Sequence, residues 1–265
     1  MSEKRIFVSA GGGLNCGENS WPRICQEKLN CELHDLTEEK IGNALISRKL
    51  IYKINELLKT HNADEIIVGV MWNTPNIHER YIDNGKNDEY VPKPEIELTS
   101  VVDGVKNWRV LNHEWISSSE DTETYFKVMY DKLQSYVFSI EHMLRTQWYL
   151  KKLGIKYFMT THLDFFHKQE NYLKMYDFKK LKEFGKMRYN IGITNYSEIH
   201  SLYNMLQKSS FLPIDGMLEW LQEHHPNDGF EDLEKLNPNQ LGHEKFVTEM
   251  IIPFLKKTYE IDLFW

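Results

Sequence analysis

The feature that most limits the possible folds is an apolar segment near the amino terminus that ends in three consecutive glycines. Residues 5–10 read Arg-Ile-Phe-Val-Ser-Ala, and Gly11, Gly12 and Gly13 follow. The apolar run predicts a buried strand, and the glycines predict a sharp turn or a close approach of the backbone to another group. A helical pattern begins at Trp21. A turn between a strand and a helix lies at the carboxyl edge of an open α/β sheet, where binding sites are found.

The same alternation of strand and helix continues along the chain. Strands are predicted over residues 31–36, 64–72 and 155–161, and the second of these is apolar on both faces, as a central parallel strand should be. Helices are predicted over residues 21–29, 41–58, about 120–153 and 242–259, with a kink at Pro253. We therefore expect one α/β domain over residues 1–265, a three-layer α/β/α sandwich of flavodoxin-like type whose mostly parallel sheet has about five strands.

Two stretches depart from this alternation. Residues 76–120 are rich in Asn, Asp, Gly, Pro and Glu, and they predict an inserted loop or hairpin. Residues 168–224 predict several extra helices. Long insertions in compact domains are often lids or partner surfaces, so we expect both to lie near the carboxyl edge.

Composition and charge exclude several classes of protein. The net charge is −7 and no Lys/Arg block is present, which gives no strong signal for nucleic acid. No apolar run approaches the roughly 18 residues of a membrane span, and no signal peptide precedes the first strand. The three cysteines, Cys16, Cys25 and Cys31, are odd in number and form no CxxC pair, which favours reduced thiols. We expect a cytoplasmic or virion-associated protein without a metal or cofactor.

Two sequence blocks then point to a family. Residues 11–17, Gly-Gly-Gly-Leu-Asn-Cys-Gly, resemble the first block of the SGNH/GDSL hydrolases, which reads Gly-Asp-Ser-Leu-Thr-x-Gly. Residues 234–243, Glu-Lys-Leu-Asn-Pro-Asn-Gln-Leu-Gly-His, are similar to the last block, Asp-x-x-His-Pro-Asn-x-x-Gly-His. The resemblance spans nearly the whole chain and is closest to the SGNH-like proteins of large phages and marine viruses.

The positions that hold the catalytic triad in that family are substituted here. By resemblance, Gly13 stands at the nucleophile, Glu234 at the acid and Asn237 at the histidine. Glycine has no side chain that attacks, and an asparagine amide accepts no proton near neutral pH. The resemblance therefore implies a hydrolase scaffold without its reaction.

The resemblance also implies an oxyanion hole. Gly42 corresponds to the glycine whose N–H helps to bind the oxyanion, and Asn73 to the asparagine whose side chain completes the site, with Gly13 as the third donor. Equally, Gly42 reads as a helix start that needs close packing, and Asn73 as part of a turn. Arg80 is a candidate contact for an anion.

Other residues offer a displaced active site. Ser20 and Cys16 lie near the glycine turn, and His243, His225 and His162 are candidate bases. His162, Asp164 and His167 have a spacing that suits a metal, although hydrogen-bonded loop residues explain it better. His225-Pro226-Asn227 reads as a loop. Trp21, Trp72 and Trp108 lie near predicted sheet edges, where aromatic rings suit stacking on sugars.

Two hypotheses follow from these residues. In the first, the chain is a non-catalytic relative that binds a glycan or an acyl ester at the carboxyl edge, or serves in a virion or in contact with a host. In the second, it is an esterase that uses Ser20 or Cys16 as nucleophile. A hydrogen bond between one of these side chains and a histidine near Gly13 would favour the second.

Overall fold

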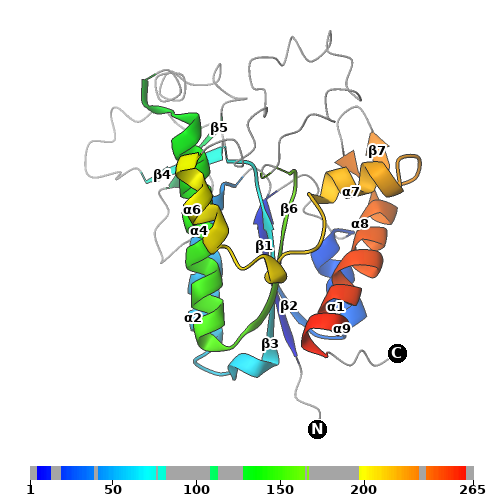
Figure 1. The fold of residues 1–265 in the computed structure, drawn as a ribbon. Coiled ribbons are helices and arrows are strands. Elements are labelled where there is room, and N and C mark those ends of the chain that lie inside the picture. Colours follow the sequence, from blue (N-terminus) through cyan, green and yellow to red (C-terminus); the bar gives the residue numbers. More distant parts are fainter. Residues whose placement is uncertain are drawn as a thin grey trace, which may run out of the picture.

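A parallel sheet of four strands forms the centre of the molecule (Figure 1). The computed structural model describes residues 5–12, 19–38, 41–75, 77–81, 108–112, 128–164, 166, 197–232 and 237–260. Within them, the strands are β1 (Ile6–Gly12), β2 (Glu32–Glu38), β3 (Ile66–Trp72) and β6 (Lys156–Thr161). Their order is β2-β1-β3-β6 and every pair is parallel, as in the flavodoxin-like arrangement. The predicted fold class is confirmed, with four strands in the described part where about five were expected.

Helices cover both faces of this sheet. On one face lie α2 (Asn43–Leu57), α4 (Lys132–Leu153) and α6 (Ser197–Met205), and on the other α1 (Trp21–Leu29), α7 (Met217–His224), α8 (Gln240–Phe246) and α9 (Ile252–Tyr259) (Figure 1). The three layers bury two apolar cores because successive side chains of a strand point to opposite faces. In β1, Ile6 and Val8 belong to the core under α2 and α4, whereas Phe7 belongs to the core under α1 and α8.

A glycine in β3 makes room for aromatic rings in the second core. The ring of Phe7 stacks with that of Phe158 at 6.4 Å between centroids, and Trp21 meets both rings edge-on at 6.1 Å. A Cβ atom at Gly69 would lie 2.6 Å from the Phe158 ring and 2.9 Å from the Phe7 ring. The glycine is therefore needed for close packing in the middle of a strand.

The boundaries of several elements differ from the predicted ones. Strand β1 includes Gly11 and Gly12, which were expected in the turn, because both pair with β2. Helix α4 begins at Lys132, not near residue 120, because the Asp131 side chain accepts a hydrogen bond from the Gln134 N–H and caps it. It ends as predicted, with Gly154 in the left-handed conformation at φ 72°.

The last helix changes its winding before Pro253. Helix α8 runs into a π-helical turn, Val247–Ile251, and α9 follows from Ile252. Proline has no N–H to donate and its ring crowds the preceding turn, so the wider turn is a reasonable local response. The predicted irregularity at Pro253 takes this form.

Two small antiparallel pairs lie outside the main sheet. Within residues 76–120, β4 (Ile77–Tyr81) pairs with β5 (Trp108–Asn112), and the rest of that stretch lies outside the described residues. Nearer the carboxyl end, β7 (Phe230–Asp232) pairs with β8 (Asn237–Pro238). Single helical turns lie at Ala63–Glu65 and Lys208–Ser210, and Phe211 bridges to Met159 of β6.

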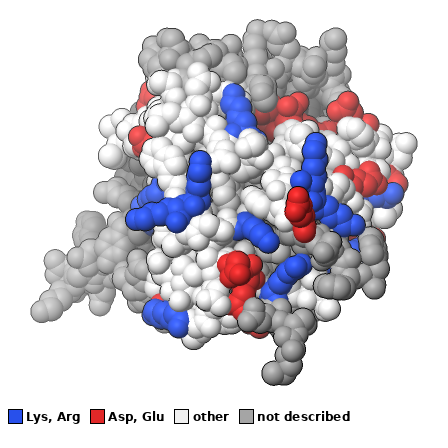
Figure 2. Space-filling model, turned by 60° about the horizontal axis from the view of Figure 1, so that its bottom comes forward, with Lys and Arg blue, Asp and Glu red and all other residues white. Residues whose placement is uncertain are grey.

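The surface seen from the amino edge of the sheet carries charges of both signs. Figure 2 shows Lys and Arg side chains interspersed with Asp and Glu among uncharged residues on the described part of this face. Among the helices of the described residues, none is long and apolar enough to cross a membrane.

Candidate functional site

The carboxyl ends of β1, β3 and β6 place Gly12, Asn73 and His162 along one edge of the sheet. Asn73 follows the last residue of β3, and His162 follows the last residue of β6, where its N–H donates to the Trp72 carbonyl at 2.8 Å. This is the edge at which the sequence predicts a site.

Gly12, Asn73 and Ile41 meet at this edge. A Cβ atom at Gly12 would lie 2.5 Å from Asn73 Nδ2 and 2.6 Å from the Ile41 carbonyl oxygen. Asn73 Nδ2 itself donates to that carbonyl at 2.9 Å, and Asn73 Oδ1 accepts from the Thr74 N–H at 2.8 Å. The amide carries a second N–H, for which the described residues provide no acceptor. The Asn73 side chain therefore braces the carboxyl edge between β1, β3 and the start of α2.

Asn43 ties three elements together, and sequence reasoning did not single it out. Its Nδ2 donates to the Asn73 carbonyl at 2.8 Å and to Ser139 Oγ at 3.0 Å, while its Oδ1 accepts from the Asn73 N–H at 2.8 Å. Gly42 is the N-cap residue of α2, directly before it. The only sequence signal for Asn43 was its place after that glycine, and the distant Ser139 could not be foreseen.

Several predicted positions lie outside the described residues. They are Gly13, Cys16, His167 and Glu234. Arg80 lies in β4, opposite Arg109 of β5, and its side chain is not described. The predicted oxyanion donors Gly42 and Asn73 are both at the carboxyl edge, and the position of the third donor, Gly13, stays a prediction.

His162 and His243 are buried near one another. Burial lowers the pKa of His162 to about 4. Burial, and then the nearby His162 imidazole, lower the pKa of His243 to about 4 as well. Among the described residues, His162 Nε2 and both ring nitrogens of His243 have no hydrogen-bond partner. Both rings are therefore neutral at neutral pH, and both are weak bases.

The segment after His162 is organised by carboxylates. Asp164 Oδ1 accepts from the Phe166 N–H at 2.9 Å, and the Asp164 N–H donates to Glu219 Oε1 at 2.7 Å. The sequence predicts that His162 and Asp164 are hydrogen-bonded loop residues. Asp164 makes such hydrogen bonds, whereas the ring nitrogen Nε2 of His162 has no partner among the described residues. Within the described ranges, no group of three or more His, Cys, Asp or Glu residues is placed to hold a metal ion.

Asn237 lies in β8, just before the last helix. Its Nδ2 donates to Glu231 Oε2 at 3.1 Å, and its Oδ1 is buried without a hydrogen-bond partner among the described residues. The next asparagine caps α8, because Asn239 Oδ1 accepts from the Gly242 N–H at 2.8 Å. Residues 237–243 thus form the start of the last helix, with the Asn237 amide just before it.

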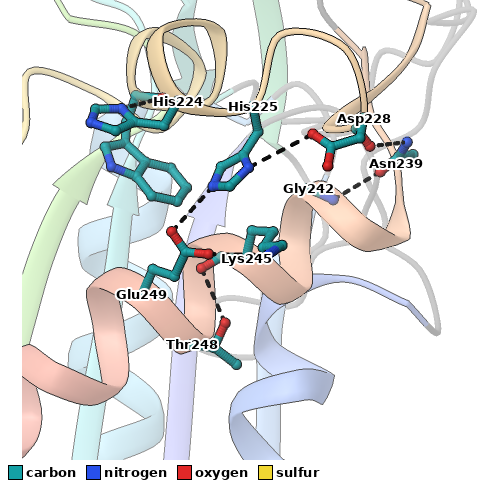
Figure 3. Close-up of polar contacts among 9 residues, drawn as sticks. His224, His225, Asp228, Asn239, Gly242, Lys245, Thr248 and Glu249 are labelled. Carbon is teal, nitrogen blue, oxygen red and sulfur yellow. Dashed lines mark hydrogen bonds and ion pairs between the residues drawn. The ribbon is translucent and has the colours of Figure 1, made fainter.

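His225, the remaining candidate base, is held at the surface by two carboxylates (Figure 3). Its Nε2 lies 3.1 Å from Glu249 Oε2, and its Nδ1 lies 3.7 Å from Asp228 Oδ1. Burial alone raises the pKa of Glu249, but hydrogen bonds from His225 and Lys245 outweigh it and bring the pKa below its usual value. As predicted, His225 belongs to a turn region, and it joins the end of α7 to the π-helical turn.

The nucleophile and sugar-stacking candidates are less accessible than the sequence suggests. Ser20 is buried as the N-cap residue of α1. Trp21 and Trp72 are 4% and 0% exposed, so neither offers a face for a sugar ring, and the prediction of stacking there is wrong. Both rings fill the apolar cores instead. The side chain of Trp108 is not described.

The comparisons with known proteins include a solved structure that aligns with nearly the whole chain. No protein-family model matches the chain, and no curated protein matches it. Among solved structures, a member of the lipolytic protein G-D-S-L family from Veillonella parvula DSM 2008 aligns with 97% of this chain and 98% of its own. The TM-score is 0.41 and the sequence identity is 12%.

Proposed function

We propose that the chain is an SGNH/GDSL-like protein that has lost serine-hydrolase chemistry and uses the carboxyl edge of its sheet to bind a carbonyl-containing ligand, such as an acyl ester or its carboxylate product. The observation that carries this proposal is that none of the candidate bases is suited to accept a proton from a serine. Asn237 stands where the family has its histidine, and its amide is bonded to Glu231. An amide cannot take the proton that a serine must lose in order to attack.

The other imidazoles are poor substitutes. The pKa values of about 4 for His162 and His243 lie well below the value near the working pH that suits a general base. His243 makes no hydrogen bond through either ring nitrogen to any described residue, so Ser20 is not activated by it. His225 is engaged by Asp228 and Glu249. These contacts support the first hypothesis over an esterase with a displaced nucleophile.

The ligand class is inferred from the donor that remains at the edge. Within the part of the chain that the structure describes, Asn73 has one amide N–H without an acceptor besides its bond to the Ile41 carbonyl, and by resemblance this is the asparagine that binds the oxyanion. Such a donor suits a carbonyl or carboxylate oxygen. The burial of Trp21 and Trp72 removes the main support for a glycan.

Hydrolysis of p-nitrophenyl acetate tests the loss of catalysis. We expect the wild-type rate to equal that of Asn237→Ala, Ser20→Ala and Cys16→Ala, without saturation by substrate. An intact triad contributes on the order of a million-fold in turnover. Saturable wild-type turnover that disappears in Ser20→Ala or Cys16→Ala would contradict the proposal.

Binding of butyrate, followed by saturation-transfer NMR, tests the ligand class. We expect a signal with wild type that is lost in Asn73→Ala and kept in Asn55→Ala, a change at an exposed amide of α2 that is remote from the edge. Equal signals from the two variants would exclude Asn73 as the donor.

A further inference from the structure

The outward side of helix α4 carries exposed residues at a regular spacing. Helix α4 lies beside α2 and α6 in the layer that covers one face of the sheet (Figure 1). Six of its exposed residues follow one another at alternating intervals of four and three, and they are Gln134, Phe138, Glu141, Arg145, Trp148 and Lys152. Residues three or four apart share one side of a helix, so these six form a single stripe, which we call the α4 stripe.

Two aromatic rings in the α4 stripe are open to solvent. Phe138 is 42% exposed and Trp148 is 55% exposed. Two further exposed apolar side chains, Tyr52 of α2 and Met205 of α6, belong to the same helical layer. On the helices of the opposite layer, Leu241 of α8 is the exposed large apolar residue among those that the structure describes. Exposed aromatic side chains that gather on one layer are typical of a surface that contacts another protein.

Two opposite charges lie between these rings. Glu141 and Arg145 are both exposed and are separated by about one helical turn. Arg145 Nε donates to Ser47 Oγ at 3.2 Å, which ties the side chain to α2, and neither charged residue forms an ion pair with any described residue. Each of the two charges can therefore meet a charge of opposite sign on a partner.

The order of residues in the α4 stripe is symmetric about its middle. Phe138 and Trp148 lie five residues on either side of position 143. Glu141 and Arg145 lie two residues on either side of it. Two copies of α4 packed antiparallel, with a two-fold axis at this position, would place each Glu141 against Arg145 of the second copy. Each Phe138 ring would likewise meet the Trp148 ring of the second copy.

We propose that the chain forms a homodimer through the α4 stripe, with the two copies of α4 antiparallel about a two-fold axis. A two-fold interface must be complementary to itself, and the order of rings and charges in the stripe meets this condition. A parallel pair would oppose Glu141 to Glu141 and Arg145 to Arg145, and like charges that face each other weaken binding. The alternation of four and three residues is the spacing at which two helices pack along their length. The interface is separate from the carboxyl edge and does not depend on the proposed function.

The length of the α4 stripe indicates how strong this dimer should be. From Gln134 to Lys152 the stripe extends for about 27 Å, at about 1.5 Å per residue. A contact along a single helix of this length lies at the small end of specific protein interfaces. We therefore expect a reversible dimer in which the rings supply most of the affinity and the charges set the orientation.

Sedimentation equilibrium of the whole protein, at concentrations up to roughly 100 µM, tests the interface because this range populates a dimer with a micromolar Kd. Wild type should dimerise. Glu141→Arg replaces two opposite-charge pairs by two like-charge pairs and should raise the dimer Kd about tenfold or more. Glu141→Arg combined with Arg145→Glu exchanges the charges and should bring the Kd back close to that of wild type. Glu223→Arg, an equal change of charge at an exposed position of α7, is the matched control and should leave the Kd unchanged.

Trp148→Ala tests the contribution of the rings. Because the dimer contains this contact twice, the variant should raise the Kd about tenfold or more. Leu241→Ala, at the exposed apolar position of α8, is the matched control and should dimerise like wild type.

Three results would overturn the proposal, provided that circular dichroism shows each variant to be folded. A wild type that remains monomeric over the whole concentration range has no such interface. An unchanged Kd in Glu141→Arg or in Trp148→Ala would place the interface elsewhere on the molecule. Failure of the double variant to recover the affinity lost in Glu141→Arg would exclude the antiparallel pairing.

Discussion

At the residue scale, Gly12 is where the packing of the carboxyl edge is tightest. Alanine there would place its Cβ 2.5 Å from Asn73 Nδ2 and 2.6 Å from the Ile41 carbonyl oxygen. Because both neighbours are hydrogen-bonded to each other, Gly12→Ala should lower the free energy of unfolding by about 1–3 kcal/mol. Urea denaturation measures this change.

Gly154→Ala is the comparison for Gly12→Ala. A Cβ at Gly154 meets nothing within 4 Å, but the residue has φ 72°. Gly154→Ala should lower the free energy of unfolding by about 1–2 kcal/mol, because alanine is strained in this backbone conformation. It should not affect butyrate binding. Gly12→Ala should weaken that binding through Asn73. If Gly12→Ala changes neither stability nor butyrate binding, then Gly12, Asn73 and Ile41 are not in the close contact described above.

The two buried histidines predict how stability depends on pH. Their pKa values are lowered from 6.5 to about 4 in the folded state. Between these values the unfolded chain binds more protons, so the free energy of unfolding should fall as pH falls from about 6.5 to 4, by at most ~1.4 kcal/mol per pH unit for each histidine. His243→Gln should remove one such contribution and flatten the slope.

Urea midpoints measured from pH 7.5 down to 4.5 give this slope. Leu241→Gln, at an exposed position two residues earlier in α8, controls for disturbance of the helix and should keep the wild-type slope. The assignment of His243 as buried and neutral fails if His243→Gln and wild type lose stability in parallel.

The sequence predicted the position of a site residue correctly where that residue comes directly after the end of a strand. Asn73 and His162 were placed at the carboxyl edge because each comes just after an apolar run. The proximity of His162 to His243 was not predictable, since it depends on how α8 packs on the sheet. The same holds for Arg145 and Ser47, which lie on different helices.

At the element scale, Asn43 holds α2, α4 and the end of β3 in register. Asn43→Ala removes a donor and an acceptor that satisfy the buried N–H and carbonyl of Asn73. Each buried group left without a partner costs about 1–3 kcal/mol, so the variant should lose roughly 2–5 kcal/mol in denaturant unfolding. Asn55→Ala, which removes one exposed contact between the same helices, should lose less than about 1 kcal/mol.

Hydrogen exchange shows whether Asn43 acts locally or on the whole domain. Faster exchange of the α2 and β3 amides in Asn43→Ala, with α8 and α9 unchanged, is the expected pattern. Equal stability losses in Asn43→Ala and Asn55→Ala would mean that the buried tie to β3 contributes little.

Periodicity predicted the elements well, and their ends less well. Helix α1 was predicted over its observed residues, because the helical apolar pattern begins at Trp21. The start of α4 was wrong, since the acidic run at residues 120–123 resembles a helix start and Asp131, which caps the helix, has no distinctive neighbours. Gly13 is the third glycine of the predicted turn. Its role could be inferred only from the family resemblance, and the residue lies outside the described part of the chain.

At the scale of the whole molecule, the sheet order places the strand ends that carry Gly12, Asn73 and His162 next to one another. Alternation of strands and helices was sufficient to predict this architecture, because parallel strands need helical crossovers. It could not predict how residues 76–120 fold, where short apolar segments alternate with turn formers. Only β4 and β5 of that stretch are described.

The most direct test of the central claim is covalent labelling of the whole protein with a fluorophosphonate, read by intact mass. The reagent traps a serine only when a neighbouring base activates its hydroxyl. If Asn237 stands in place of the base, as proposed, no activated serine is expected. His243 is buried and weakly basic, and its ring nitrogens have no hydrogen-bond partner among the described residues, so we expect no adduct on the native protein. A single stoichiometric adduct that disappears in Ser20→Ala would show an activated nucleophile and contradict the loss of serine-hydrolase chemistry.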